Sequence, residues 1–445
     1  MSRRLKTLRQ DLSQSLAFLP VCVVVLFAVA AVGLGEIDKG LDAEAITWAF
    51  SGDQSAARTV LSVVAGSLIT VAGLTFSITI VVLQLASSQF SPRILRTFFG
   101  DRITQATIGT FVGTFVYALL VLRSVGSFSE DGFVPRLSVT VATVLAVAAV
   151  ALLVVFLNHV ARLIQVSHVA ADLAGKTGAR LDALYPERIG GDVEEEEDGR
   201  ELVARWRRDP GGRVDAQHDG FVRRVTVTQL LRAARDAGAE RVAVLVRPGD
   251  FVAVGALLAE VWPAAAAERC RPAVRQAVVL GRERELHDDA AFGLRQLGDI
   301  GIKALSPSIS DPATAVTSIG YLRSLLVRLA AREPPSAVRC AETLTVVVAR
   351  RDFEEDLDVL VQMSRYVRGD AWVAEVLIEA IGACADAARA SGAGDRELCA
   401  LRMARTVGDA AGGEARTPHD AALVARATAR ACAGGRRPGP TRIIA

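Results

Sequence analysis

The stretch that decides the fold of this chain is Thr59–Arg93, TVLSVVAGSLITVAGLTFSITIVVLQLASSQFSPR. No Asp, Glu, Lys or Arg occurs between Arg58 and Arg93. An uncharged apolar run of about 18 residues or more is long enough to cross a bilayer as a helix. A helix of roughly 31 residues reaches about 46 Å, so we expect it to tilt or to project beyond the membrane. Pro92 lacks an N–H and disfavours a helical Ser91, which predicts that the helix stops or kinks there.

The same stretch carries a row of polar side chains. They are spaced three, four or seven residues apart, which places them on one helical face: Ser67, Thr70, Ser77, Gln84 and Ser88. Lipid offers hydroxyl and amide groups no hydrogen-bond partner, so we expect this face to contact protein or water. Lining of a pore and packing between helices both remain open.

Small residues mark two possible sites of close helix contact. Gly66, Thr70, Gly73 and Ser77 form a ridge in this span, and Gly109 and Gly113 form a G-x-x-x-G in a later one. Small residues let helix backbones approach closely in lipid. Contacts within one four-helix bundle and contacts between subunits fit the pattern about equally well.

Three further uncharged apolar spans occur, at Leu12–Gly35, Ile103–Leu122 and Leu137–Ala161. Each is long enough to cross a hydrocarbon core of about 30 Å. Basic residues precede the first span, as in a signal peptide, but three more spans follow, so we expect a retained signal anchor. The predicted fold class is an α-helical integral membrane protein, with a four-helix transmembrane domain over residues 1–165.

The distribution of Lys and Arg predicts the orientation in the membrane. Basic residues gather in three segments: Arg3, Arg4, Lys6 and Arg9 before the first span, Arg93, Arg96 and Arg102 after the second, and Arg162, Lys176 and Arg180 after the fourth. The two other loops are acidic, with Glu36, Asp38, Asp42, Glu44 and Asp53 in one and Glu130 and Asp131 in the other. We expect a multi-pass protein of the bacterial inner (plasma) membrane with both termini cytoplasmic.

Charged residues become frequent after residue 165, which predicts a cytosolic α+β region. Residues 166–214 are predicted to be a connecting segment with an acidic linker, Glu194–Asp198. A small β-rich module is expected over 215–265, with strands at Phe221–Val227, Arg241–Val246, Phe251–Val254 and Leu257–Val261 and a helix capped by Thr228. Residues 266–432 are predicted to form a helical domain, including helices at Ala273–Glu285 and Ser336–Arg350, and 433–445 a disordered tail.

A second polar motif lies in the predicted helical domain. It comprises Arg295, Asp299, Lys303, Ser306, Pro307, Asp311 and Pro312. Its first three residues are four apart, which allows a ladder of ion pairs on one helical face. The Ser-Pro pair is expected to end this helix, and the Asp-Pro pair to cap and begin the next one. We interpret the motif as capping in a packed helix-loop-helix; the alternative is a polar surface for a ligand or a neighbouring subunit.

Two runs, LQLASSQFSPRILRTF and FGLRQLGDIGIKALSPSISDPATA, resemble the bacterial family of predicted membrane proteins labelled DUF2254. The first matches at Gln89, Ser91, Pro92 and Arg93, which form a membrane-interface motif, and the second at Arg295, Asp299, Ala304, Leu305, Ser306, Pro307, Asp311 and Pro312. Where the family pattern has Gly-Ile-Asn before the last Asp-Pro, this chain has Ser308-Ile309-Ser310. The resemblance implies four spans, a β-containing middle and a helical C-terminal part, and no particular reaction.

Several classes of function are disfavoured. The chain has 51 basic and 49 acidic residues, which gives no argument for nucleic-acid binding. None of the spans carries an ionisable residue at its middle, which argues against a proton-coupled pump. No G-x-S-x-G, P-loop or H-E-x-x-H motif occurs, and Cys and His lack the spacing of metal ligands, so we expect no enzymatic activity, cofactor or metal.

Two hypotheses of function remain. The first is a homo-oligomeric, channel-like pore lined by the polar face of the second span, with a cytosolic regulatory or assembly domain. The alternative is a non-transporting membrane scaffold or sensor, in which the polar face packs between helices and the cytosolic domain binds a protein or small ligand. The expected partners are the lipid bilayer and further copies of the chain, with an ion or ligand that the sequence leaves unidentified.

Overall fold

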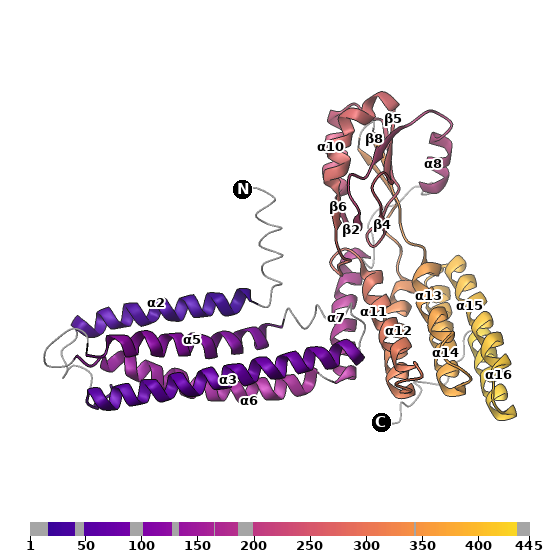
Figure 1. Cartoon of the computed structure of the whole chain (residues 1–445). Helices are drawn as coiled ribbons and strands as arrows, with labels where there is room; N and C mark the ends of the chain where they lie inside the picture. Colours follow the sequence, from indigo (N-terminus) through magenta and orange to yellow (C-terminus); the bar gives the residue numbers. More distant parts are fainter. Residues whose placement is uncertain are drawn as a thin grey trace. The chain divides into compact units, whose positions relative to one another are not determined.

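The computed structural model describes residues 17–40, 49–89, 101–126, 133–163, 165–185, 199–341 and 344–433. Side chains at the end of the second helix, from residue 86 on, also lie outside this description. The chain divides into two compact units, Met1–His168 and Val169–Ala445 (Figure 1). The first holds the long apolar helices, and the second holds the sheets and the remaining helices.

The first unit is a bundle of α2 (Phe18–Gly40), α3 (Gln54–Gln89), α5 (Arg102–Ser124) and α6 (Arg136–Leu163). All four are long and apolar enough to cross a membrane, which confirms the four predicted spans as helices. α3 is the longest, with 36 residues. It begins before the predicted Thr59 because Asp53, which the sequence assigned to a loop, accepts a hydrogen bond from the Ala56 N–H at 2.9 Å.

α2 also extends past its predicted end at Gly35, through two acidic residues that were expected in a loop. Asp38 in its last turns is buried and accepts hydrogen bonds from the N–H groups of Leu137 and Ser138, each at 2.9 Å. A carboxylate is a favourable partner for the free N–H groups of a helix start. Asp38 is therefore part of α2, and its carboxylate caps the first turn of α6.

α5 packs against the other three helices of the bundle. Its Phe111, Tyr117 and Ala118 are fully buried. A Cβ added to Gly109 would lie 2.9 Å from the Pro20 Cα of α2, and one added to Gly113 would lie 3.0 Å from the Phe27 ring. The G-x-x-x-G of α5 therefore serves a contact within the bundle, because it lets α2 approach closely.

The second unit contains two sheets. Their strands are β1 (Gly212–Asp215), β2 (Gly220–Val225), β3 (Arg241–Val244), β4 (Phe251–Val252), β5 (Leu257–Trp262), β6 (Val278–Gly281), β7 (Val338–Ala341) and β8 (Leu344–Val348). The five-stranded sheet has the order β1-β5-β3-β8-β7, and the smaller sheet has the order β4-β2-β6. β3 and β8 are parallel, and the other pairs are antiparallel.

The four strands predicted in the β-rich module all occur, but the helices predicted at Ala273–Glu285 and Ser336–Arg350 are wrong in part. Residues from both segments form strands, namely β6, β7 and β8. Val346 packs into the core on one face of the larger sheet and Val347 into the core on the other. A short run that is apolar on both faces lacks the alternation by which a strand differs from a helix, which explains the error.

Helices cover both faces of the larger sheet. α9 (Val227–Asp236) and α10 (Ala267–Ala277) bury Leu230 and Val274 in one core, and the short η1 (Ala264–Ala266) precedes α10. α8 (Gly199–Trp206) packs against the opposite face, where Trp206 meets Trp262 edge-on at 5.6 Å between ring centroids. Thr226, rather than the predicted Thr228, stands at the N-cap of α9.

The remaining helices form an antiparallel bundle (Figure 1). They are α7 (Val166–Leu184), α11 (Ala290–Ala304), α12 (Pro312–Ala331), α13 (Phe353–Ser364), α14 (Ala371–Ala390), α15 (Gly394–Gly413) and α16 (Pro418–Ala433). α14 is the core helix, with Val373, Leu377 and Ile381 fully buried. Residues 166–214, predicted to be a connecting segment, contain α7, α8 and β1. The acidic linker and the predicted disordered tail from residue 434 lie outside the described residues.

Candidate functional site

The polar row of α3 points away from its own bundle. Ser67, Thr70, Ser77 and Gln84 are exposed. At about 100° per residue, Gly66, Thr70, Gly73, Ser77 and Gln84 fall within an arc of roughly 60°. The buried side chains of Leu61, Leu68, Thr75 and Val82 occupy a similar arc on the opposite side of the helix. We call the outward arc the α3 stripe; Ser67 lies about 60° beyond it on the same exposed side of the helix.

The α3 stripe is also bare. A Cβ added to Gly66 or Gly73 would meet nothing within 4 Å. The Ser67 and Thr70 hydroxyls donate to carbonyls of the preceding turn, those of Val63 and Gly66, at 2.8 and 2.9 Å. The side chains of Ser77 and Gln84 have no hydrogen-bond partner among the described residues. Within one chain, the stripe therefore does not serve as packing between the described helices.

The end of this predicted site cannot be placed in the same way. Ser88 and Gln89 lie in the last turn of α3, and their side chains are outside the described part of the chain. Ser91, Pro92 and Arg93 of the membrane-interface motif lie in the segment 90–100, which is also outside it. The structure therefore tests the stripe from Gly66 to Gln84 and not the motif that follows.

The motif between α11 and α12 consists of capping interactions. Asp311 caps α12 by accepting from the Thr314 N–H at 3.0 Å, with Pro312 in the first turn. The Ser306 hydroxyl donates to the Lys303 carbonyl at 2.7 Å and closes the end of α11. Pro307 follows in the loop. These contacts match the predicted packed helix-loop-helix.

The loop also shows a feature that the sequence did not predict. Ser310 has a backbone φ of +50°, a conformation that Asn adopts more readily than Ser. On the helix before it, Arg295 donates to Gln362 of α13, a partner outside the predicted series of Arg295, Asp299 and Lys303. This side chain thus links α11 to a different helix.

A group of buried charges lies where α11 and α13 begin. Asp289 caps α11 through the Phe292 N–H at 3.1 Å and accepts from Arg284 at 2.6 Å. Its side chain is 3% exposed, so this cap is shielded from water. Burial raises the pKa of the Asp289 carboxyl. Asp356 on α13 pairs with Arg351 at 2.8 Å, and burial raises its pKa to about 6.

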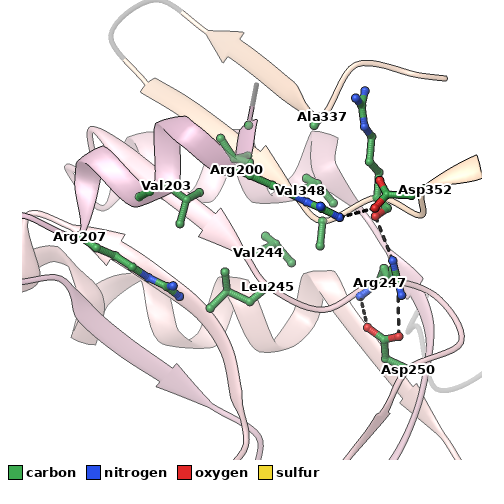
Figure 2. Close-up of a pocket in the computed structure, with 15 residues that line it drawn as sticks. Arg200, Val203, Arg207, Val244, Leu245, Arg247, Asp250, Ala337, Val348 and Asp352 are labelled. Atoms are coloured by element: carbon green, nitrogen blue, oxygen red, sulfur yellow. Dashed lines mark hydrogen bonds and ion pairs between the residues drawn. The ribbon is translucent and has the colours of Figure 1, made fainter. Parts of the chain in front are cut away.

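A pocket of about 460 Å³ opens beside α8, at the carboxyl ends of the parallel strands β3 and β8 (Figure 2). Its floor is apolar, with the side chains of Val203, Leu245 and Val347 on the face of the sheet that α8 covers. Its charged lining consists of four arginines and two aspartates: Arg200, Arg207, Arg247, Arg350, Asp250 and Asp352. In open sheets, the carboxyl ends of neighbouring parallel strands are the usual place for a ligand.

Sequence reasoning missed this pocket. Four of its six charged residues lie in two short runs, VRPGD at 246–250 and RRD at 350–352, which follow β3 and β8. The first run lies between two predicted strands, at Arg241–Val246 and Phe251–Val254, and the second begins with Arg350, the last residue of the helix predicted at Ser336–Arg350. The signal in the sequence was an arginine directly after each of two apolar runs. It indicates a shared site only once both runs are known to be neighbouring parallel strands.

No metal site joins these features. Among the residues that the structure describes, no three His, Cys, Asp or Glu side chains gather as metal ligands do. The six cysteines are all free thiols, and two of them, Cys270 and Cys384, are buried. The α3 stripe and the pocket beside α8 are therefore the two features that carry a functional argument.

Comparison with known proteins agrees with this architecture. The chain is 33% identical over 409 residues to uncharacterised proteins of Mycobacterium tuberculosis and Mycobacterium bovis. These matches cover 88% of this chain and 75% of each relative. No solved structure matches the chain. The model of the family described as "Predicted membrane protein (DUF2254)" matches residues 13–383, and the chain therefore belongs to this family of membrane proteins.

Proposed function

We propose that this membrane protein is a homo-oligomeric, channel-like pore in which α3 of each copy faces a shared axis. The observation that carries the proposal is the outward direction of the α3 stripe. If the stripe packed against α2, α5 or α6, contacts within one chain would account for its polar residues and no second copy would be required. Instead, it lies opposite the side of α3 that those helices cover.

The rest of the bundle surface supports this assignment by contrast. The outward face of α6 presents Val144, Val147, Val150 and Val154, each at least 61% exposed. Such branched aliphatic side chains suit contact with lipid. On α3, similar side chains such as Val63 and Ile80 flank the stripe, and the middle of the face is small and polar. Small residues favour close helix approach, and uncharged polar groups favour contact with water or with a second helix.

The chemistry of the stripe fits a pore without strong charge selection. Hydroxyl and amide groups line it, and the described part carries no charged side chain between Arg58 and Gln84. Such a lining lets hydrated solutes pass without binding them tightly. The basic residues before the first span, after the second and after the fourth favour cytoplasmic termini in a bacterial cell under the same proposal.

Leucine substitutions at two glycines test the proposal. Gly73 lies in the stripe and Gly33 on α2, and a Cβ at either position meets nothing within 4 Å. Both Gly73→Leu and Gly33→Leu should therefore leave the single-chain fold intact. Each purified variant is compared with wild type for oligomer size in detergent and for conductance in planar bilayers. We expect the stripe variant to lose both oligomer and conductance, and the α2 variant to keep both.

Two results would contradict the pore. Wild-type protein that is a monomer in detergent and in crosslinked membranes would remove the shared axis. Wild-type oligomers without conductance would support the proposed self-association and contradict the proposed transport. The second result would favour the alternative function, a membrane scaffold or sensor, for which the pocket beside α8 is the supporting observation.

A further inference from the structure

We propose that the pocket beside α8 binds a small soluble molecule that carries a phosphate monoester on a compact organic body. The pocket lies entirely within the second unit. The proposal is independent of the pore, because it concerns different residues and a different readout. It rests on the position of the pocket, the state of its arginines and its apolar floor.

Arg247 is a fixed anion contact. Its guanidinium donates to the Arg350 carbonyl at 3.0 Å and pairs with Asp250 at 3.4 Å (Figure 2). It also pairs with Glu355 at 2.8 Å. Its backbone N–H also donates to Asp250, at 3.0 Å. A guanidinium has five N–H groups, so at least two remain for a ligand. A side chain held in this way loses little freedom when it binds an oxyanion.

Arg350 supplies charge that nearby carboxylates do not cancel. It is exposed, and its side chain has neither a hydrogen-bond nor an ion-pair partner among the described residues. Burial and then the like charge of Arg350 lower the pKa of Arg396 on α15, which is not among the residues that line the pocket. By contrast, Arg207 is paired with Glu260 at 2.8 Å. An oxyanion with several acceptor oxygens is the natural partner for such a position.

Arg200 stands on the opposite wall, on α8. It pairs with Asp352 at 2.6 Å, and both side chains are well exposed, so this contact is easily exchanged for a ligand oxygen. Arg200, Arg247 and Arg350 thus approach the pocket from α8 and from the loops after the two parallel strands. A phosphate monoester offers three oxygens and a charge near −2, more than a single carboxylate can offer to three donors.

The floor of the pocket predicts an organic body attached to the phosphate. The side chains of Val203, Leu245 and Val347 form it, and no hydroxyl or amide side chain is among the lining residues. The body is therefore held by burial of apolar surface, and the phosphate provides the orientation. Inorganic phosphate should bind more weakly than a phosphate monoester. The parent alcohol, which has the organic body and no phosphate, should bind more weakly still.

Calorimetric titration of the full-length protein in detergent tests this order. The probes are adenosine monophosphate, adenosine and inorganic phosphate. We expect adenosine monophosphate to bind, and the Arg350→Gln variant to weaken it roughly tenfold or more, the loss typical of one charged hydrogen-bond donor. The Ala204→Trp variant, at an exposed position of the lining, should block the pocket without disturbing the core. Arg232→Gln, on the exposed side of α9, is the matched control.

A second arm separates soluble from lipid phosphate. The protein is placed in nanodiscs with and without phosphatidic acid, and adenosine monophosphate is titrated into both. Equal affinity in the two discs supports a soluble ligand. Binding of phosphatidic acid that Arg350→Gln abolishes, together with no binding of adenosine monophosphate, would overturn the assignment. So would an absence of binding by every soluble probe, or binding that neither Arg350→Gln nor Ala204→Trp changes.

Discussion

At the scale of single residues, Asp356 determines how stability responds to pH. It is 6% exposed at the start of α13 and pairs with Arg351, while Glu355 and Asp289 add repulsion. Burial raises its pKa from the ordinary 3.8 to about 6, against the attraction of Arg351. The folded state therefore favours the protonated form. Its contribution to stability is complete below about pH 4 and is lost as the pH rises through about 6.

Removing this titration should flatten the pH profile. Between about pH 4 and 7, wild type should lose up to about 3 kcal/mol of unfolding free energy relative to Asp356→Asn, since one pKa unit corresponds to about 1.4 kcal/mol. Denaturant unfolding followed by tryptophan fluorescence measures this, because Trp206, Trp262 and Trp372 all lie in the second unit. Parallel profiles for the two proteins would show that Asp356 does not titrate in this range.

Two aspartates show which properties of a helix cap can be predicted from the sequence. Asp311 is recognisable as a cap because Pro312 follows it and the loop before it is short, and the structure confirms the cap. Asp289 is also at a helix start, but its burial arises from Arg284 and Phe292, which fold over it. Local chemistry therefore predicts that a residue caps a helix. It does not predict whether the cap is solvated, since that depends on side chains brought in by the fold.

At the scale of elements, two glycine ridges with similar sequences have opposite surroundings. Gly109 on α5 faces the backbone of α2, whereas Gly66 on α3 faces open space. Sequence alone assigned both to close helix contacts and left the partner open. The difference follows from which face of each helix is covered, and this depends on the arrangement of the whole bundle.

Alanine substitutions distinguish the two ridges. Gly109→Ala should destabilise the protein by about 1–3 kcal/mol, because the new Cβ would lie 2.9 Å from the Pro20 Cα. Gly66→Ala should leave thermal stability unchanged or raise it by roughly 0.5–1 kcal/mol, since Ala favours a helix over Gly. Thermal unfolding in detergent, read by size-exclusion fluorescence, compares the variants. Equal losses would mean that Gly66 is packed as closely as Gly109, and the oligomer size of the protein in detergent then shows whether the partner is a second copy.

The strands show a different limit of sequence reasoning. β2, β3 and β5 were predicted because turns with Gly, Pro or Asp separate them. β8 was assigned to a helix because Val346, Val347 and Val348 follow one another without polar alternation. Its β-branched residues favoured a strand, and its position in the middle of the larger sheet explains the missing alternation. The pocket was missed for the same reason, since it exists only where β3 and β8 meet.

At the scale of the whole molecule, α7 belongs to the packing of the second unit. Its Leu173 and Leu181 are buried, Asp182 pairs with Arg332 at 2.6 Å, and the Tyr185 carbonyl accepts from Arg332 at 3.0 Å. A buried leucine contributes about 1.5–3 kcal/mol relative to an exposed one. The predicted connecting segment is therefore, in this part, a structural helix.

Truncation measures its contribution. We expect a chain of residues 166–445 to fold without detergent, because its cores lie within the second unit. A chain of residues 199–445 should melt at a lower temperature, because it lacks the buried face of α7. Circular dichroism during heating compares the two. Equal melting temperatures would show that α7 adds no stability, and aggregation of the longer chain would show that the second unit needs the first.

The parallel pairing of β3 with β8 also affects how the protein is made. In the described part of the chain, four strands (β4, β5, β6 and β7), the short η1 and the helices α10, α11 and α12 lie between these strands in the sequence. Until the ribosome has released residues 344–348, β3 is the edge of an incomplete sheet, with a row of unpaired backbone groups. Pairings between such distant segments form slowly and expose the chain to aggregation meanwhile. The ligand pocket is completed by the same late event, so the nascent chain becomes able to bind only after its sheet is closed.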